Sequence, residues 1–311
     1  MPISSKIILY ASYQTGDSLP GYVQFALRHL AETEDFTVVL LTNNRPLSAD
    51  TMKFLEENRI HLYLTENHGF DFGMWRRFLK DLANGHGNFA PLNGITRLLL
   101  VNDSIVYYQN KFAEFIERAE ASTADVVSLT QNDEVRPHLQ SFFLYIKQEA
   151  LGAFYLHLLE TPEQETFYDV VHRLEIGMAR VFEEAEVQTA ALYRTHLPVM
   201  FAYPELIAQG CGFVKRKLLQ RRFDIKEKVH FIRHKAYNAL NANYAELAVN
   251  AGLAPDFKKE WLPTPFGNTA SKAVDHLWQK AFDKVGWPIL RTAIKTKYKI
   301  LGKPLEGDEY K

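Results

Sequence analysis

Apolar runs of strand length alternate with segments of helical spacing along the N-terminal two thirds of the chain. Residues 6–12, 36–42 and 60–65 are expected to be buried strands, with helices over 22–31 and 49–58 between them. A further helix is expected from about Met74 to Ala83, before a strand that ends at Asn102-Asp103. Short connections join these units. The alternation predicts an α/β fold with a Rossmann-like, doubly wound and mostly parallel sheet.

The same pattern continues through the middle of the chain. It predicts a helix over 111–121, strands over 125–129, 142–146 and 189–193, and a helix from Phe167 that turns Leu174 and Met178 inward. Past Pro204 the chain becomes helical and basic, with prolines as breaks. We therefore expect an α/β domain over residues 1–225, a helical basic region over 226–304, and a tail over 305–311 without an apolar pattern.

Composition narrows the class of protein. The 311 residues are 47% hydrophobic and 23% charged, which is typical of a globular protein. No apolar run of about 18 residues and no signal-peptide pattern is visible, so a cytoplasmic location is predicted. The single cysteine, Cys211, excludes an internal disulfide and a metal site built from cysteines.

The net charge of −1 hides an uneven distribution. Residues 212–303 hold 19 Lys and Arg against 7 Asp and Glu, whereas residues 1–211 hold 16 against 27. The basic region is predicted to meet phosphate or an anionic membrane surface, here the inner face of the cytoplasmic membrane. The alternatives are a well-solvated helical surface and a helical cap on the α/β domain. Nucleic-acid binding is not expected, because the segment has no nucleic-acid motif.

The triplet Asn102-Asp103-Ser104 interrupts an apolar run that extends over residues 96–108. In an α/β protein the carboxyl ends of the strands face the ligand, so a polar triplet there is placed to hold a metal, a diphosphate or a sugar. The alternative is a polar junction between a strand and a turn, since Asn and Asp are common turn residues.

A second polar segment runs from Asn67 to Gly73, between a predicted strand and a predicted helix. Gly69 and Gly73 would let the backbone approach a ligand closely, and the helix behind them offers N–H groups. The spacing matches neither a phosphate-binding loop nor a dinucleotide fingerprint. The alternative is a tight turn with Asp71 as the helix cap.

Two further positions carry candidate chemistry. Strand alternation over His138 to Ser141 would place His138 and Gln140 on one side and Leu139 and Ser141 on the other. Glu175 lies at the edge of an apolar helix face, where burial could raise its pKa and suit it to act as a general base. The alternatives are a structural histidine and a solvated helical glutamate.

Taken in order, these segments resemble the rhamnan-synthesis protein F family of bacterial polysaccharide assembly. The matching pieces are residues 67–75, 99–104, 138–143, 174–178 and 212–215, and together they span about residues 6–225. The resemblance implies a GT-A-type glycosyltransferase. It implies transfer of a deoxyhexose, typically L-rhamnose from a dTDP donor, onto a lipid-linked glycan such as O-antigen, capsule or cell-wall polysaccharide.

The resemblance also implies roles for individual residues. Glu175 would remove the proton from the acceptor hydroxyl in an inverting transfer, and Asp103 would hold the diphosphate and a metal ion. His138, Gln140 and Ser141 would position sugar hydroxyls of the donor or acceptor. The nucleotide-sugar donor would be bound by Tyr10, Ser12, Tyr13, Asn43, Asn67, Gly69, Asp71, Gly73, Asn102, Asp103 and Lys215.

The chain departs from this family pattern in ways that leave alternatives open. Many GT-A enzymes have Asp-x-Asp where this chain has a single carboxylate, Asp103. That carboxylate could still hold Mg²⁺ or Mn²⁺ with the donor phosphates, or Lys215 or Arg216 could neutralise the diphosphate without a metal. Residues 212–215 lack the proline usual in the family segment. A retaining transferase and a catalytically silent sugar- or nucleotide-binding subunit of an assembly complex are the alternative functions.

Overall fold

The computed structural model describes residues 4–43, 46–86, 89, 91–133, 135–195, 199 and 202–216. The predicted domain boundary at residue 225, the basic region 226–304 and the tail 305–311 lie outside these residues. None of the helices in the described ranges is long and apolar enough to cross a membrane.

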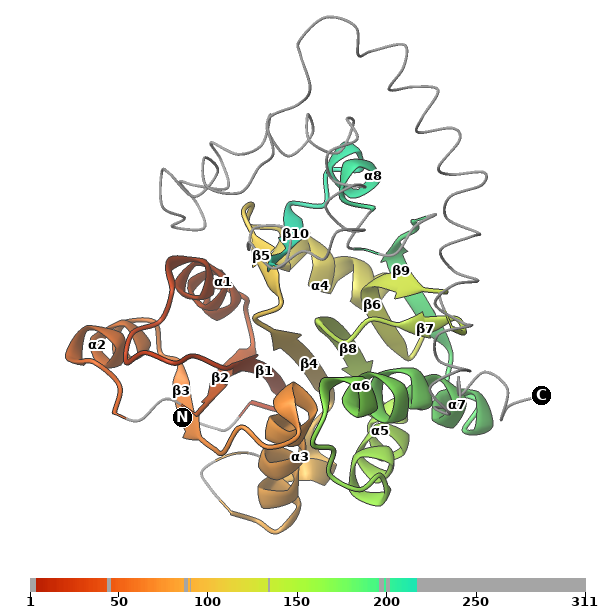
Figure 1. Cartoon of the computed structure of the whole chain (residues 1–311), viewed down its shortest axis with the longest axis horizontal. Helices are drawn as coiled ribbons and strands as arrows, with labels where there is room; N and C mark the ends of the chain where they lie inside the picture. Colours follow the sequence, from red (N-terminus) through yellow and green to blue (C-terminus); the bar gives the residue numbers. More distant parts are fainter. Residues whose placement is uncertain are drawn as a thin grey trace, which may run out of the picture.

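One mixed sheet forms the centre of the molecule (Figure 1). Its strand order is β3-β2-β1-β4-β8-β6-β7, and β9 pairs with β6. The pairs β1–β2, β1–β4, β2–β3 and β6–β9 are parallel, whereas β8 is antiparallel to β4 and β6, and β7 is antiparallel to β6. The strands are β1 (Lys6–Ser12), β2 (Phe36–Thr42), β3 (His61–Leu64), β4 (Arg97–Asn102), β6 (Val126–Asn132), β7 (His138–Leu139), β8 (Phe143–Lys147) and β9 (Thr189–Tyr193).

Helices cover both faces of this sheet (Figure 1). Alternate residues of β1 enter different apolar cores: Ile8 belongs to a core that includes residues of α1, α2 and α4, and Ile7 belongs to one that includes residues of α3, α5 and α7. Both faces of β1 are therefore buried, as its uninterrupted apolar sequence predicts. The predicted Rossmann-like α/β fold is confirmed. These helices are α1 (Gly21–Ala31), α2 (Ala49–Glu57), α3 (Phe70–Ala83), α4 (Phe112–Ala121), α5 (Gln148–Glu160) and α7 (Gly177–Glu184).

A small antiparallel pair, β5 (Ile105–Tyr107) and β10 (Phe213–Lys215), was not expected from the sequence. Its register places Lys215 opposite Ile105, and the backbone N–H of Arg216 donates to the carbonyl oxygen of Ser104 at 2.8 Å. The pairing therefore returns the chain to the Asn-Asp-Ser triplet more than a hundred residues later. The short helix α8 (Tyr203–Ala208) lies against β10, and the short helix η1 (Leu92–Gly94) lies against α3.

The helix expected from Phe167 onward consists of three different segments. A short turn, α6 (Phe167–Asp169), leads into a stretch of π-helix, η2 (Val170–Ile176), and then into α7. The Nε2 atom of His157 lies 3.0 Å from the carbonyl oxygen of Leu174 inside this stretch. Stretches of π-helix inside α-helices are frequent at functional sites, and this one carries Glu175.

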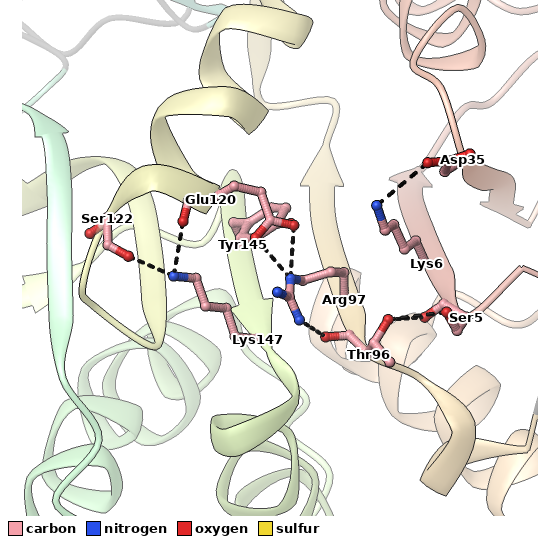
Figure 2. Close-up of polar contacts among 9 residues, drawn as sticks. All are labelled: Ser5, Lys6, Asp35, Thr96, Arg97, Glu120, Ser122, Tyr145 and Lys147. Carbon is pink, nitrogen blue, oxygen red and sulfur yellow. Dashed lines mark hydrogen bonds and ion pairs between the residues drawn. The ribbon is translucent and has the colours of Figure 1, made fainter.

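Polar contacts also join β4, β8 and α4 at the amino end of β4 (Figure 2). The guanidinium of Arg97 binds Glu120 at 2.8 Å, and the hydroxyl of Tyr145 donates to the same carboxylate at 2.5 Å. Burial raises the pKa of Glu120, but these two partners outweigh it and lower the pKa. Lys147 donates to the carbonyl oxygen of Ser122 at 2.6 Å, next to the last turn of α4. Each of these groups has a partner, so the network is structural.

Candidate functional site

The site begins where β1 and β4 end side by side. Their parallel register sets Ala11 opposite Asn102, and the backbone N–H of Asp103 donates to the carbonyl oxygen of Ala11 at 3.1 Å. Ser12 and Asp103 therefore lie together at the carboxyl ends of neighbouring parallel strands. This is the edge at which α/β sheets bind ligands.

Three donors converge on one carboxylate oxygen of Asp103. Its Oδ2 atom lies 3.2 Å from the hydroxyl of Ser12, 2.9 Å from Nε2 of Gln14 and 3.0 Å from Nη1 of Arg216. The same Nη1 donates to the hydroxyl of Tyr22 at 2.8 Å. We call these five residues the Asp103 cluster. Burial raises the pKa of Asp103, and the charge of Arg216 and the bond from Ser12 only partly offset that effect.

The other residues of the triplet extend this cluster. The side-chain oxygen of Asn102 accepts from the hydroxyl of Ser104 at 2.6 Å. The ammonium of Lys215 lies 3.4 Å from the Ser104 hydroxyl and 4.5 Å from the centre of the Phe142 ring. Two consecutive cationic residues, Lys215 and Arg216, therefore lie beside the triplet. The β5–β10 pairing is the element that positions both of them.

The Asn67–Gly73 segment differs from its prediction, because α3 begins at Phe70 and not near Met74. Gly73 consequently lies in the first turn of the helix, where a Cβ atom would overlap the carbonyl oxygen of His68. Gly69 precedes the helix in the left-handed conformation with a φ of 73°, which favours glycine. The turn is tight because the backbone of Gly73 lies directly against the carbonyl group of His68.

Asp71 connects this turn to the triplet. Its Oδ2 atom accepts from the amide of Asn102 at 2.5 Å, and its Oδ1 atom accepts from the backbone N–H of Phe72 at 3.0 Å. Burial and the negative charge of Glu175 raise the pKa of Asp71 to about 6. Asp71 therefore accepts a hydrogen bond from the triplet and also interacts electrostatically with Glu175. These segments form one site.

Glu175 is held by two residues of the His138–Ser141 segment, which we call together the Glu175 cluster. The hydroxyl of Ser141 donates to Oε2 of Glu175 at 2.5 Å, and Nε2 of His138 lies 3.6 Å from Oε1. The Nδ1 atom of His138 lies 2.8 Å from the carbonyl oxygen of Arg136, so Nδ1 carries a hydrogen. Nε2 is therefore the ring nitrogen that faces the carboxylate of Glu175.

The pKa of Glu175 moves opposite to the expectation of a raised value. Burial does raise it, but the hydrogen bonds from His138 and Ser141, together with the charges of His138 and Lys215, outweigh burial and lower it. The side chain is 15% exposed. Glu175 is thus an ionised carboxylate at neutral pH, partly open to solvent.

The expected faces of residues 138–141 are also wrong in part. His138 and Ser141 meet at Glu175, whereas the amide oxygen of the buried Gln140 accepts from the hydroxyl of Thr130 at 2.8 Å. Strand alternation fails here because β7 ends at Leu139. Gln140 therefore supports β6 and does not share the side of His138.

The remaining residues predicted to bind the nucleotide-sugar donor differ in position and exposure. Tyr10 is fully buried, Tyr13 is 48% exposed, and Asn67 is exposed in the turn before α3. The side-chain oxygen of Asn43 accepts from the backbone N–H of Gln14 at 3.4 Å. Tyr10 and Tyr13 therefore cannot play the same part.

Two members of the Asp103 cluster were not singled out from the sequence. Gln14 stands in a polar loop and Tyr22 in the first turn of α1, and neither carries a motif. Arg216 was considered only as an alternative cation beside Lys215. Its position could be found only from the long-range pairing of β5 with β10.

Arg77 on α3 holds the loop that precedes this helix. Arg77 donates to the hydroxyl of Thr65 at 2.7 Å, to the carbonyl oxygen of His68 at 2.8 Å and to that of Glu66. The guanidinium thereby ties the loop that carries Asn67 to the helix behind it. No sequence signal marked this arginine.

Protein ligands for a metal are few at this site. Within the described ranges, no group of three or more His, Cys, Asp and Glu side chains could hold a metal ion. Asp103 is the single carboxylate expected to hold a metal ion. One of its oxygens, Oδ2, forms an ion pair with the guanidinium of Arg216.

The layered sheet defines the class as a Rossmann-like α/β protein, and the charged cluster at the carboxyl edge of the sheet is its candidate site. Comparison with protein families narrows this class. The model of the family described as rhamnan synthesis protein F matches residues 38–247, which is more than half of the chain. The chain therefore belongs to the rhamnan synthesis protein F family.

Known proteins similar to this chain are distant from it. The uncharacterized protein y4gN of Sinorhizobium fredii (strain NBRC 101917 / NGR234) is 25% identical over 199 residues, 62% of this chain and 49% of that protein. The chain thus spans about half the length of this curated relative.

Solved structures show a general likeness at low identity. A mannosyltransferase from Pyrobaculum calidifontis, in complex with GDP-Man and Mn²⁺, is 11% identical with a TM-score of 0.41, over 94% of this chain and 87% of that chain. A glycosyltransferase involved in glycosylation of the major capsid of PBCV-1 is 12% identical with a TM-score of 0.38, over 68% and 94%. A cytidylyltransferase from Leptospira borgpetersenii serovar Hardjo-bovis (strain JB197) is 12% identical with a TM-score of 0.37, over 78% and 96%.

Proposed function

We propose that this chain is a glycosyltransferase of bacterial polysaccharide synthesis, which moves a sugar from a nucleotide-sugar donor to a glycan acceptor. Membership of the rhamnan synthesis protein F family supports this function. The observation that carries it is the pairing of two clusters at one sheet edge: an ionised Glu175 for the acceptor, and cations beside Asp103 for the donor phosphates. The donor we propose is dTDP-L-rhamnose, and the acceptor is a lipid-linked glycan.

The reaction that suits this geometry is an inverting displacement. The acceptor hydroxyl forms a bond from its oxygen to the anomeric carbon while the bond from that carbon to the diphosphate oxygen breaks. Glu175 takes the proton of the hydroxyl, and the diphosphate leaves with the bonding electron pair. His138 and Ser141 hold Glu175 ionised and fix its direction. Lys215 and Arg216 stabilise the negative charge on the leaving group.

Substitution of Glu175 by Gln tests this assignment directly. The amide keeps the volume and an acceptor for Ser141 but cannot take a proton, so transfer should fall by roughly 10²- to 10⁴-fold. Donor binding should remain close to that of the unchanged protein. The measurements are dTDP release from dTDP-L-rhamnose with a lipid-linked acceptor, and isothermal titration of the donor.

The matched control is Glu184→Gln on the next turns of the same helical segment, where the carboxylate pairs with Arg180 at 3.4 Å. This variant should transfer sugar at the normal rate. Normal turnover in Glu175→Gln would remove Glu175 from the mechanism. NMR analysis of the product anomer distinguishes inversion from the alternative, a retaining transfer in which Glu175 only orients the substrate.

A further inference from the structure

The residues around Asp103 do not fit a resident divalent cation. Mg²⁺ and Mn²⁺ bind through the lone pairs of oxygen ligands. The Oδ2 atom of Asp103 already accepts from Ser12, Gln14 and Arg216, and the charge of the guanidinium stands 3.0 Å away. A second cation at this oxygen would meet direct repulsion. No second carboxylate accompanies Asp103 in the triplet.

We propose that Arg216, assisted by Lys215, is the diphosphate-binding group of this site, and that the site binds nucleoside diphosphates without a divalent metal. This inference rests on the proposed function, because it assigns the phosphates of the proposed donor. It selects Arg216, which the sequence had left as an alternative to a metal ion. It also assigns neutralisation of the diphosphate charge to side chains of the protein.

The guanidinium is suitably oriented for this task. Among the described residues the printed contacts of its side chain run through Nη1, to Asp103 and to Tyr22. A guanidinium has two further N–H-bearing atoms, Nε and Nη2, with which it can bind an anion. A planar guanidinium that offers two adjacent N–H groups binds phosphate oxygens in a bidentate manner. The Arg216 side chain is 30% exposed and can therefore reach a ligand. Lys215, the preceding residue, adds a point charge beside Ser104.

The surroundings also allow Arg216 to exchange one anion for another. Asp103 is 12% exposed at its side chain and needs partners when the guanidinium turns to phosphate. Ser12 and Gln14 remain bound to it. The hydroxyl of Tyr10 is buried, has no hydrogen-bond partner among the described residues, and interacts electrostatically with both Asp103 and Arg216. This hydroxyl can donate to the Asp103 carboxylate when Arg216 turns to phosphate.

Isothermal titration of the full chain with inorganic pyrophosphate and with dTDP tests the proposal. Both probes should bind in EDTA as well as in Mg²⁺ or Mn²⁺. Arg216→Gln should weaken both by roughly ten- to a hundredfold, because it removes a charged hydrogen-bond donor. The matched control is Arg97→Gln, whose guanidinium pairs with Glu120 at the other end of β4 (Figure 2). That variant should bind both probes normally.

Asp103→Asn separates this proposal from a metal site. In our proposal Asp103 competes with phosphate for Arg216, so the amide should leave the affinity for pyrophosphate unchanged or raise it. A metal site would lose affinity. If Arg216→Gln does not fold, as judged by thermal unfolding, Arg216→Lys should still bind more weakly than the unchanged protein.

Each other outcome has a definite meaning. Binding that requires Mg²⁺ or Mn²⁺, or normal binding by a folded Arg216→Gln, overturns the role of Arg216 and leaves the proposed transferase standing. Absence of binding of dTDP, pyrophosphate and nucleotide sugars under all conditions overturns the proposed function itself.

Discussion

At the scale of single residues, three carboxyl groups share one site but have different proton affinities. Burial and the charge of Glu175 raise the pKa of Asp71 to about 6, while His138 and Ser141 lower that of Glu175. Burial raises the pKa of Asp103 in spite of Arg216. Such divergence is common where carboxyl groups have different tasks in one site. It also makes the stability of the protein depend on pH.

Asp71 should therefore reduce stability as the pH rises. Its pKa is higher in the folded chain than in the unfolded chain, so between about pH 4 and pH 6 the folded protein binds more protons, and its free energy of unfolding falls as pH increases. Asp71→Asn should remove this slope and stabilise the protein at pH 7 by on the order of 1–3 kcal/mol. Urea unfolding at pH 4, 5, 6 and 7 measures the effect. An equal slope in both proteins would contradict it.

Gly73 should tolerate no side chain. A Cβ atom would overlap the carbonyl oxygen of His68, so Gly73→Ala should destabilise the chain by about 2–4 kcal/mol in urea unfolding. Gly152→Ala is the control, because this glycine lies in α5 with nothing within 4 Å of its Cβ position. There alanine should stabilise by about 0.5–1 kcal/mol. Similar effects of the two substitutions would show that His68 can move away.

At the scale of elements, the sequence predicts the strands and helices that have strong periodicity, and it fails where distant contacts decide. The strands of residues 6–12, 36–42 and 189–193 agree with the structure. The first two have apolar runs that are largely buried, whereas residues 189–193 are mostly half-buried. The segments 67–73, 102–104 and 138–141 were singled out as polar residues next to predicted strands or helices, and Glu175 as a carboxylate at the edge of an apolar helix face. The β5–β10 pair was missed, since its strands are three residues each and lie far apart in the chain. Gln14 and Tyr22 likewise reach Asp103 only through the fold.

The π-helical stretch that carries Glu175 shows the same dependence on distant contacts. His157 on α5 lies 3.0 Å from the carbonyl oxygen of Leu174 and 3.3 Å from the hydroxyl of Thr161. Burial lowers the pKa of His157, which keeps the ring neutral with its hydrogen on Nε2. A neutral ring satisfies both partners. His157 is therefore a positioning residue for Glu175, which follows Leu174.

His157→Phe should remove the side-chain donor from this carbonyl oxygen, which keeps the backbone N–H of Gly177, and cost about 0.5–1.5 kcal/mol of stability. Because Glu175 is the next residue, kcat for sugar transfer should fall by about tenfold while KM for the donor stays constant. His157→Gln, which can still donate, should recover part of kcat. The control is Leu156→Ala, whose side chain is 54% exposed. Full activity of His157→Phe at normal KM would disprove the positioning role.

At the scale of the whole molecule, the two ends of the central sheet have separate tasks. The amino end of β4 is fixed by the network of Arg97, Glu120, Tyr145 and Lys147 (Figure 2), and the carboxyl end carries the charged site. A rigid base of this kind allows the loops at the opposite edge to carry the chemistry. The acceptor we propose is lipid-linked, so the site must also be brought to a membrane surface. The excess of basic residues over 212–303 is the feature of the sequence suited to that task.

The full chain should bind anionic membranes through this basic segment. We expect it to sediment with vesicles that contain phosphatidylglycerol at low salt, and to be released at high salt as the charges are screened. Substitution of Lys295, Lys297 and Lys299 by Gln should weaken binding by on the order of 100-fold, at about 1 kcal/mol for each lost charge. The control replaces Lys53, Lys80 and Arg180, which are exposed on the α/β domain, and should bind normally. Equal loss in both variants would assign the effect to net charge alone, and failure to sediment at low salt would leave the basic segment without a membrane role.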